Sequence, residues 1–466
     1  MTAGRLRTSN MSRRDMLRLS GLGALGAAAP AALASCGGGG SGGDGAELQF
    51  MYWGSTFEQK AMNAMLAEYK EHSNGGEVQP LYTPGTDYTT KLNTLVASKR
   101  APDLAYLGGG VLYRLAEQGK LINLYPYLKK YPELGERLPY TYYWYGKNKL
   151  AATQTANEVM LLWYNKQAFD DAGIDYPPAE ADKAWTWDQL VEAATKLTMD
   201  QDGRHPDEPG FDSKAIRQFG IASNWNNFGW YPLVRSNGGE AVDDSGTDFV
   251  LNGAEGVQVF QDLQDLTFKH RVAPTPAQLA TGGAGVPTTP RLLQTRRVAM
   301  AMDGQWLLLD MAQSNLDYGI GVLPKYQEAL TVGFAAGTVA FTGKGHDDEA
   351  VELYMFHNDP RYVDLYKDGL WMPLEEKFYS DQAAIDSWTK NDAHPPEFRT
   401  AVVDYTLNNS VRQYDQSLKN TDNIAEVMTP ALQQIQNGKR PAKEVLDELK
   451  PKVDKLLQGY YPTQEL

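Results

Sequence analysis

Aromatic and acidic side chains follow the ends of the first three expected strands of the chain. Trp53 ends the first strand, Asp87 follows the second, and Gly108 opens a triple-glycine segment after the third. In parallel sheets, ligands bind in the loops beyond the carboxyl ends of the strands. An indole ring packs on the C–H face of a pyranose, and a carboxylate accepts hydrogen bonds from two neighbouring hydroxyls. These residues predict a sugar site, unless Trp53 is a core residue and Asp87 only caps its helix.

Three more tryptophans present the same choice between a ligand cleft and the core. Trp225 and Trp230 lie in the aromatic segment NWNNFGW, which follows an expected strand at 219–223. Trp371, in the segment GLWMP, either contacts a ligand or fastens a connection between domains. Large aromatic rings serve both purposes, so the sequence leaves each alternative open.

Other catalytic patterns fail in their context. The pattern GxGxxG at 21–26 has no strand before it, and GxSxG at 39–43 lies in a glycine-rich linker that cannot hold a strained nucleophile. The six histidines show no HExxH or other short ligand spacing. We therefore expect no catalytic residue, no metal and no cofactor. A glycoside hydrolase with two carboxylates remains the alternative, because acidic residues are plentiful.

The composition describes an acidic globular protein with more than one domain. A length of 466 residues exceeds what one core of usual size supports. The formal charge is −14, and residues 1–35 contain five Arg and one Asp, so the remaining body is more acidic still. Such a body disfavours binding to nucleic acid or anionic lipid. With one cysteine, Cys36, no intramolecular disulfide can form.

The elements that position these residues begin with an alternation of strands and helices. Apolar runs predict three strands separated by two helices, at 48–53, 57–72, 78–82, 87–98 and 102–107. This βαβαβ order is typical of a parallel, doubly wound α/β sheet.

The segment 157–198 carries the clearest local signals. A buried strand is expected at 159–164, and the short helix after it ends at Gly173, a C-cap residue. Thr186 and Gln189 have the spacing of a capping box, which predicts the start of the next helix.

The first 45 residues have the features of a signal sequence for export followed by a linker. Arg13-Arg14 before an apolar run at 21–34 resembles the twin-arginine signal. The sequence Leu-Ala-Ser-Cys ending at Cys36 resembles the bacterial lipobox, which implies cleavage before Cys36 and its lipidation; the alternative is an ordinary signal peptide with an incidental cysteine. Residues 37–45 are rich in glycine and are expected to form a flexible tether.

The sequence YNKQAFDDAGID, followed by Pro-Pro and then TWDQLVEAATKLT, resembles a signature of the solute-binding proteins of ABC sugar importers, the maltodextrin-binding-protein-like family. The resemblance implies an α/β, two-lobed periplasmic-binding-protein fold of type II, with mainly parallel sheets and three hinge crossings. It places lobe 1 at 46–150 and 334–372, and lobe 2 at 151–333 and 373–466.

The resemblance also carries site residues. Glu158 lies six residues before Tyr164, the spacing of a sugar-contacting glutamate in the family. Asp303-Gly304-Gln305-Trp306 resembles the family's Gly-Pro-Trp motif, with Gln replacing Pro, and implies that Trp306 stacks on the sugar with Asp303 nearby. Gly337, in an expected return strand at 332–341, would lie close to the cleft.

Further elements are expected in the second half of the chain. They are strands at 298–302 and 318–324, a helix at 254–268, and a helical region at 395–466 that ends the chain on the second lobe.

The function implied is an exported receptor, lipid-anchored at the outer face of the cell membrane. It would capture a carbohydrate and deliver it to ABC permease subunits with an associated ATPase, as a monomer that binds no nucleic acid. Besides the hydrolase, a surface adhesin is a further alternative, although an adhesin does not explain two α/β lobes.

Overall fold

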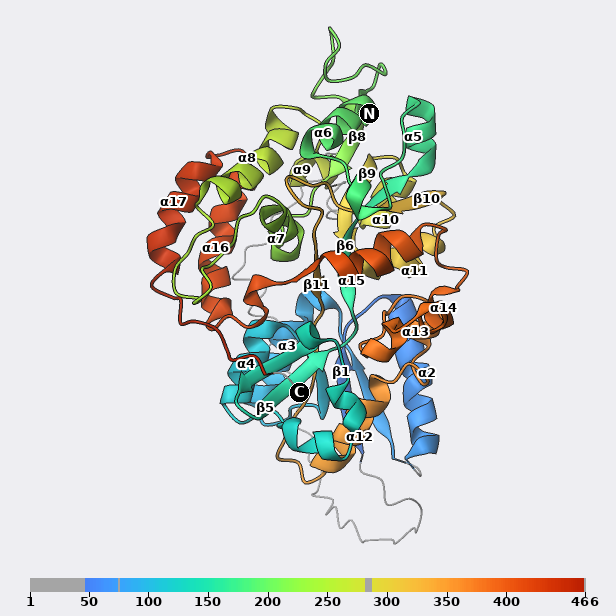
Figure 1. Cartoon of the computed structure of the whole chain (residues 1–466), viewed down its shortest axis with the longest axis vertical. Helices are drawn as coiled ribbons and strands as arrows, with labels where there is room; N and C mark the ends of the chain where they lie inside the picture. The colour runs from blue at the N-terminus through green and yellow to red at the C-terminus, as the bar shows by residue number, and fades with distance from the viewer. Residues whose placement is uncertain (1–46, 74–75, 281–286, 465–466) are drawn as a thin grey trace, which may run out of the picture. The chain divides into compact units, whose positions relative to one another are not determined.

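The computed structural model describes residues 47–73, 76–280 and 287–464. These residues form two β-sheets flanked by helices, and each sheet is the centre of one lobe (Figure 1). Both lobes belong to one compact unit. The predicted export signal, Cys36 and the glycine-rich tether lie outside the described residues.

Lobe 1 is built on a six-stranded sheet with the order β2-β1-β3-β12-β5-β4. Helix α2 packs against β2, α12 packs against β12 and against α2, and α4 packs against β4, β5 and β12. Its strands and helices are β1 (Leu48–Tyr52), α2 (Thr56–His72), β2 (Val78–Tyr82), α3 (Gly85–Ala97), β3 (Leu104–Leu107), α4 (Gly109–Glu117), β4 (Tyr142–Gly146), β5 (Lys149–Gln154), β12 (Gly337–Ala340), α12 (Asp347–His357) and α13 (Asp364–Lys367).

Lobe 2 is built on a seven-stranded sheet with the order β13-β11-β6-β9-β8-β7, in which β10 also pairs with β6. Its strands and the helices before β11 are β6 (Glu158–Asn165), α5 (Lys166–Ala172), α6 (Trp187–Leu197), β7 (Met199–Asp200), β8 (Ile216–Ala222), α7 (Asn227–Ser236), α8 (Ala254–Phe268), α9 (Pro276–Leu279), α10 (Thr289–Gln294), β9 (Val298–Gly304), α11 (Leu308–Ala312), β10 (Tyr318–Gly321), β11 (Thr331–Phe334) and β13 (Ser410–Arg412). The later helices are α14 (Gln382–Thr389), α15 (Tyr405–Asn409), α16 (Thr421–Gln436) and α17 (Ala442–Val453).

The local signals of the segment 157–198 are confirmed. Strand β6 is almost entirely buried, as its apolar run predicts. Gly173 ends α5 with a left-handed backbone, φ 64°. Thr186 and Gln189 form a complete capping box at the start of α6, each side chain bonding the other's backbone N–H.

The sheets are mixed, whereas the sequence predicts mainly parallel ones. Strands β1, β2 and β3 pair in parallel as expected, but β12 runs antiparallel to β3, and β6 runs antiparallel to β9, β10 and β11. The return strand expected at 332–341 is two strands: β11 belongs to the sheet of lobe 2 and β12 to the sheet of lobe 1. The break could not be predicted from the sequence, because both strands are buried and their apolar residues form one continuous run.

Three segments that connect the lobes lie side by side. Residues 155–157 join β5 to β6, residues 335–336 join β11 to β12, and the third segment is the one around Met372, which follows α13. Thr155 donates its backbone N–H to the carbonyl of Ala336 at 2.7 Å, and Asn157 donates to the carbonyl of Met372 at 3.2 Å. Ladder-like hydrogen bonds therefore hold the three segments together between the two sheets.

The C-terminal region is less helical than expected, and its last described residues contact both lobes. Helices α16 and α17 pack together and against α8 of lobe 2 (Figure 1). Strand β13 interrupts the expected helical region, and a π-helix precedes α15. Beyond α17, Tyr461 stacks on Tyr113 of α4 in lobe 1, with ring centroids 4.1 Å apart. Gly459 donates its backbone N–H to the carbonyl of Gly246 in lobe 2 at 2.9 Å, so the end of the chain bridges the two lobes.

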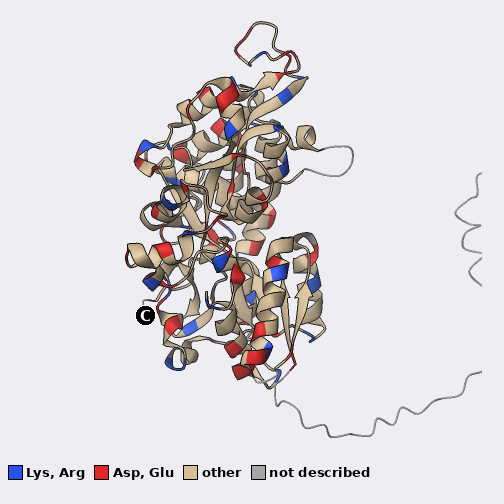
Figure 2. Cartoon of the chain, turned by 90° about the vertical axis from the view of Figure 1, so that its right-hand side faces the viewer, with Lys and Arg blue, Asp and Glu red and all other residues tan. Residues whose placement is uncertain are grey.

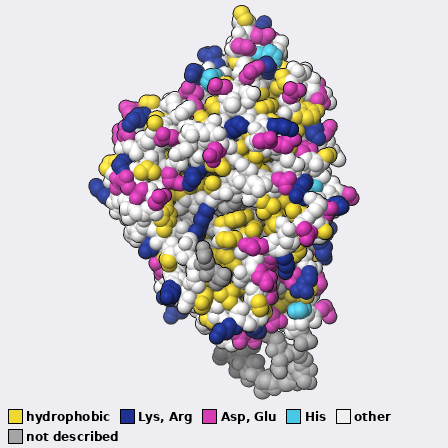
Figure 3. Space-filling model, in the orientation of Figure 1, with side chains coloured by type: hydrophobic (Ala, Val, Ile, Leu, Met, Phe, Trp, Pro, Cys, Tyr) yellow, Lys and Arg dark blue, Asp and Glu magenta, His cyan; other side chains and the backbone are white. Residues whose placement is uncertain are grey.

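Charged side chains are spread over both lobes. Figure 2 shows acidic and basic residues scattered along the helices of both sheets' outer layers. On the face drawn in Figure 3 the two signs are interspersed, with hydrophobic side chains between them. In the part of the chain that the structure describes, no helix is both long enough and apolar enough to cross a membrane.

Candidate functional site

A cavity of about 460 Å³ lies between the lobes and brings four of the predicted residues together. Trp53 follows β1 in lobe 1, Glu158 opens β6, and Trp306 follows β9 in lobe 2. Trp371, beside the third connecting segment, lies at the same cavity although it is only 3% exposed. This cavity is called the cleft below.

Aromatic rings from both lobes form the walls of the cleft. On the lobe 1 side, Trp53 and Tyr106 pack edge to face with centroids 5.3 Å apart. On the lobe 2 side, Phe228 stacks on Phe334 at 4.8 Å and meets Trp306 edge to face at 5.5 Å. Interlocked rings of this kind hold fixed orientations, so they offer flat apolar surfaces to a ligand.

Three carboxylates share the cleft with these rings: Glu58, Glu158 and Asp310. Burial raises the pKa of Glu158 to about 8, and the charge of Glu58 adds to the effect. Burial also raises the pKa of Glu58, although hydrogen bonds from Ser55 oppose the shift, and that of Asp310. No Lys or Arg occurs among the described residues that line the cleft. The cleft therefore offers acceptors and donors for uncharged polar groups and disfavours anions.

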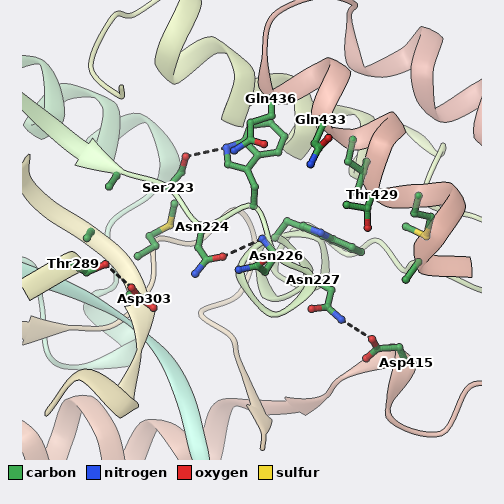
Figure 4. A pocket seen from close by; sticks show the side chains of 18 of the residues that line it. Ser223, Asn224, Asn226, Asn227, Thr289, Asp303, Asp415, Thr429, Gln433 and Gln436 are labelled. Carbon is green, nitrogen blue, oxygen red and sulfur yellow. Dashed lines mark hydrogen bonds between the residues drawn. The ribbon is translucent and has the colours of Figure 1, made fainter. Parts of the chain in front are cut away.

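A second cavity, of about 510 Å³, lies in lobe 2 and is lined by the other predicted tryptophans, Trp225 and Trp230, and by Asp303 (Figure 4). It is called the lobe 2 cavity below. Trp230 is 1% exposed and packs on Tyr414, so most of its surface is part of the core, which was the alternative to a role in binding. Asp303 accepts a hydrogen bond from Thr289 at 2.6 Å and one from the backbone of Gly304. Burial raises its pKa.

Two further predicted residues, Asp87 and Gly337, line neither the cleft nor the lobe 2 cavity. Asp87 is exposed in the first turn of α3, where a carboxylate interacts favourably with the helix dipole. This role is close to the alternative that Asp87 only caps its helix. Gly337 is buried in β12, and a Cβ at this position would lie 2.7 Å from Cδ1 of Leu112. Leu112 belongs to α4, so the lack of a side chain at Gly337 lets this helix pack closely on the sheet, directly beside the cleft residues Ala335 and Ala336.

Several cleft residues were missed by the sequence analysis. Phe228 lies within the aromatic segment NWNNFGW and Asp310 lies four residues after Trp306, so both were close to recognised motifs. Glu58 forms a capping box with Ser55, and this pattern predicts only where a helix begins. Tyr106 and Phe334 come from strands, and their position at the cleft depends on long-range pairing that the sequence does not state.

Comparisons with known proteins agree with this architecture. A family model described as "Bacterial extracellular solute-binding protein" matches residues 53–362, more than half of the chain. The sn-glycerol-3-phosphate-binding periplasmic protein UgpB of Brucella abortus is 25% identical over 433 residues, covering 86% of this chain and 91% of that protein.

Solved structures show the same fold. The ABC substrate-binding protein Lmo0181 from Listeria monocytogenes, in complex with cycloalternan, superposes with a TM-score of 0.74 at 23% identity, covering 88% of this chain and 99% of that one. The maltose/maltodextrin-binding domain MalE from Bdellovibrio bacteriovorus, bound to maltotriose, gives 0.68 at 16% identity, with coverage of 88% and 99%. The two-lobed arrangement and the extent of the family match lead to one conclusion: this chain belongs to the bacterial extracellular solute-binding protein family.

Proposed function

We propose that this protein is the receptor of an ABC importer and that its ligand is an uncharged carbohydrate held in the cleft. The observation that carries the proposal is the lining of the cleft, six aromatic rings with three carboxylates and no cationic side chain among its described residues. Aromatic faces pack on the C–H faces of sugar rings, and carboxylates accept hydrogen bonds from hydroxyl pairs.

The same lining argues against the ligand named for the Brucella abortus relative. A glycerol phosphate carries at least one negative charge, which would enter a cleft whose own carboxylates already destabilise one another. Phosphate sites in proteins rely on Arg, Lys or free backbone N–H groups. At 25% identity, ligand preference is free to differ between relatives with one fold.

A glycoside hydrolase is the second candidate, because Glu158 has the raised pKa of a general acid. Such an enzyme also needs a carboxylate that stays ionised as nucleophile or base. Burial raises the pKa values of all three cleft carboxylates, and no Lys or Arg among the described residues of the cleft lies beside one of them to hold it ionised as the nucleophile or base. This favours binding without turnover.

The mode of action follows from the connections between the lobes. The three hydrogen-bonded segments would act as a hinge, the lobes would close on the sugar, and the closed monomer would dock on a permease with an ATPase. Twin-arginine export and a lipid on Cys36 would hold the receptor at the outer face of the membrane. Replacing Cys36 with Ala should then release the protein from membranes into the medium.

The test of the ligand class is isothermal titration calorimetry of the purified protein. Neutral mono- and oligosaccharides are compared with sn-glycerol 3-phosphate, and product formation is followed in the same samples. Stoichiometric saccharide binding without products supports the proposal. Binding of the phosphate alone, or sustained hydrolysis, rejects it.

A further inference from the structure

The last described residues of the chain, 458–464, cross from lobe 2 to lobe 1 and are called the C-terminal strap below. Figure 1 shows the chain leave α17 in lobe 2 and run toward α4 in lobe 1. Hydrogen bonds fix the backbone of the strap to lobe 2. Gly459 donates its N–H to the carbonyl of Gly246 at 2.9 Å, and Tyr461 donates its N–H to the carbonyl of Ser417 at 2.7 Å.

The side chains of the strap contact lobe 1. The ring of Tyr461 stacks on Tyr113 of α4, with centroids 4.1 Å apart and an angle of 16° between the planes. Both rings are buried, with 7% and 2% of their surface exposed. Burial and the neighbouring carboxylate of Glu117, also in α4, raise the pKa of the Tyr461 hydroxyl. Further along, Gln464 accepts the backbone N–H of Asn148, between β4 and β5, at 3.0 Å.

Tyr461 alone therefore connects the two lobes, since its backbone is bonded to lobe 2 and its ring is packed in lobe 1. The anchor on lobe 2 is close-packed. Gly459 and Gly246 both have left-handed backbones, φ 78° and 70°, and a Cβ on Gly246 would lie 2.9 Å from the carbonyl carbon of Gly459. A chain held this closely has no slack with which to follow a movement of one lobe against the other.

The contact of the strap with lobe 1 lies away from the connecting segments. Tyr461 lines a cavity of about 770 Å³ between α4 and α16, and none of the described residues that line it belongs to the segments 155–157 and 335–336. An ion pair between Arg114 and Asp422 also spans these helices, with Nε and Oδ2 3.7 Å apart, but both side chains are nearly half exposed. Exposed ion pairs contribute little to stability, so the buried stack is the stronger tie.

We propose that the C-terminal strap is a latch that holds the two lobes together before any ligand binds. When the lobes rotate apart, either the ring of Tyr461 leaves Tyr113 or the strap leaves lobe 2, and both changes expose buried apolar surface. The latch rests on the lobe motion of the proposed function but not on its ligand. By raising the fraction of empty protein that is closed, the latch raises the affinity for any ligand that binds the closed form.

The test measures the distance between the lobes in the ligand-free full chain. Spin labels are attached to Thr94→Cys in α3 of lobe 1 and to Gln433→Cys in α16 of lobe 2, two exposed positions. Cys36→Ala removes the one native cysteine, so only these two sites are labelled. Double electron–electron resonance then gives the populations of short and long distances. Tyr461→Ala removes the stacked ring, and Tyr461→Phe, which keeps the ring, is the matched control.

Tyr461→Ala should raise the ratio of long to short distances roughly fivefold, as the loss of a stacked aromatic pair implies. A chain that ends at Gln458 lacks the latch and should open at least as far. Tyr461→Phe should match the unchanged protein, and circular dichroism checks that all variants are folded. Unchanged distances in both Tyr461→Ala and the shortened chain overturn the latch, and so does equal opening of Tyr461→Phe and Tyr461→Ala. Because no ligand is present, failure of the proposed carbohydrate ligand leaves this result unaffected.

Discussion

Glu58 and Glu158 reach the same cleft from different lobes, Glu58 from helix α2 and Glu158 from the first position of β6. The charge of Glu58 adds to the burial that raises the pKa of Glu158 to about 8. No cationic side chain lines the cleft in its described part to offset this repulsion. Glu158 therefore holds a proton at neutral pH, and its carboxyl group offers both a hydrogen-bond donor and an acceptor to a sugar hydroxyl.

The first prediction concerns stability against pH. At pH values between 4.5, the ordinary pKa of a glutamate, and about 8, Glu158 keeps a proton in the folded protein that it releases in the unfolded chain. Stability from this group is therefore full at low pH and is lost as pH rises toward 8 and beyond. Glu158→Gln removes the effect, so the unchanged protein should lose more unfolding free energy from pH 5 to pH 9 than the variant does. The difference should be about 2 kcal/mol, because partial exposure screens the shift.

Urea titrations at several pH values measure this difference. Glu68→Gln is the control, since Glu68 is exposed on the same helix as Glu58. If the unchanged protein and Glu158→Gln follow the same pH curve, Glu158 does not carry a buried proton.

The second prediction concerns the aromatic wall. Trp306→Ala removes the ring that meets Phe228 and Phe334, so saccharide binding should weaken by about 10- to 100-fold. Trp185→Ala is the matched control, because Trp185 packs on Phe169 and lines neither the cleft nor the lobe 2 cavity. Calorimetry gives both affinities, and circular dichroism checks the fold. Equal loss in both variants would mean that Trp306 acts through stability alone.

The third prediction concerns the contact between the lobes at α4 and α16. A Cβ on Gly110 would clash with the side-chain oxygens Oδ1 of Asp422 and Oγ1 of Thr421, whereas a Cβ on Gly109 has only ordinary contacts, the nearest at 3.7 Å. Gly110→Ala should therefore turn the side chains of Asp422 and Thr421 away from α4, which disturbs the ion pair between Arg114 and Asp422 and lowers the free energy of unfolding by about 1 kcal/mol in a denaturant titration. Gly109→Ala should leave the free energy of unfolding unchanged. Identical behaviour of the two alanine variants would contradict the close approach.

The fourth prediction concerns the helix start at Thr186. Its hydroxyl accepts the backbone N–H of Gln189 at 3.2 Å, while the Gln189 side chain accepts the N–H of Thr186 at 2.8 Å. Thr186→Ala should lower the free energy of unfolding by about 1 kcal/mol, and Thr186→Ser should restore most of it. Denaturant titration of the three proteins decides this, and no difference between Ala and Ser would show that the cap contributes nothing.

Local structure was predictable from the sequence where short-range chemistry decides it. Gly173 ends a helix because it takes a left-handed backbone, and the Thr186–Gln189 box starts one because its side chains satisfy free N–H groups. The apolar run of β6 identifies a buried strand for the same kind of reason. None of these signals depends on distant parts of the chain.

The site was predictable only in part, because it is assembled by long-range pairing. Trp53, Glu158, Trp306 and Trp371 meet at the cleft, but nothing in their local sequence separates them from Trp225 and Trp230, which line another cavity. Likewise, an apolar run cannot show that its two halves join different sheets, as β11 and β12 do. Asp87 follows β2 as expected and Gly337 comes directly after the cleft residues Ala335 and Ala336, but neither lines the cleft, because the sequence does not state which way a side chain near a strand end points.

The most direct test of the proposed function is one calorimetric comparison on the purified protein at pH 7. Neutral mono- and oligosaccharides and sn-glycerol 3-phosphate are titrated separately into the unchanged protein and into Trp306→Ala. We predict one-to-one binding of a saccharide, at least tenfold weaker in Trp306→Ala, and no binding of the phosphate at millimolar concentration. Binding of the phosphate in preference to every saccharide would contradict the reading of the cleft as a site for an uncharged sugar.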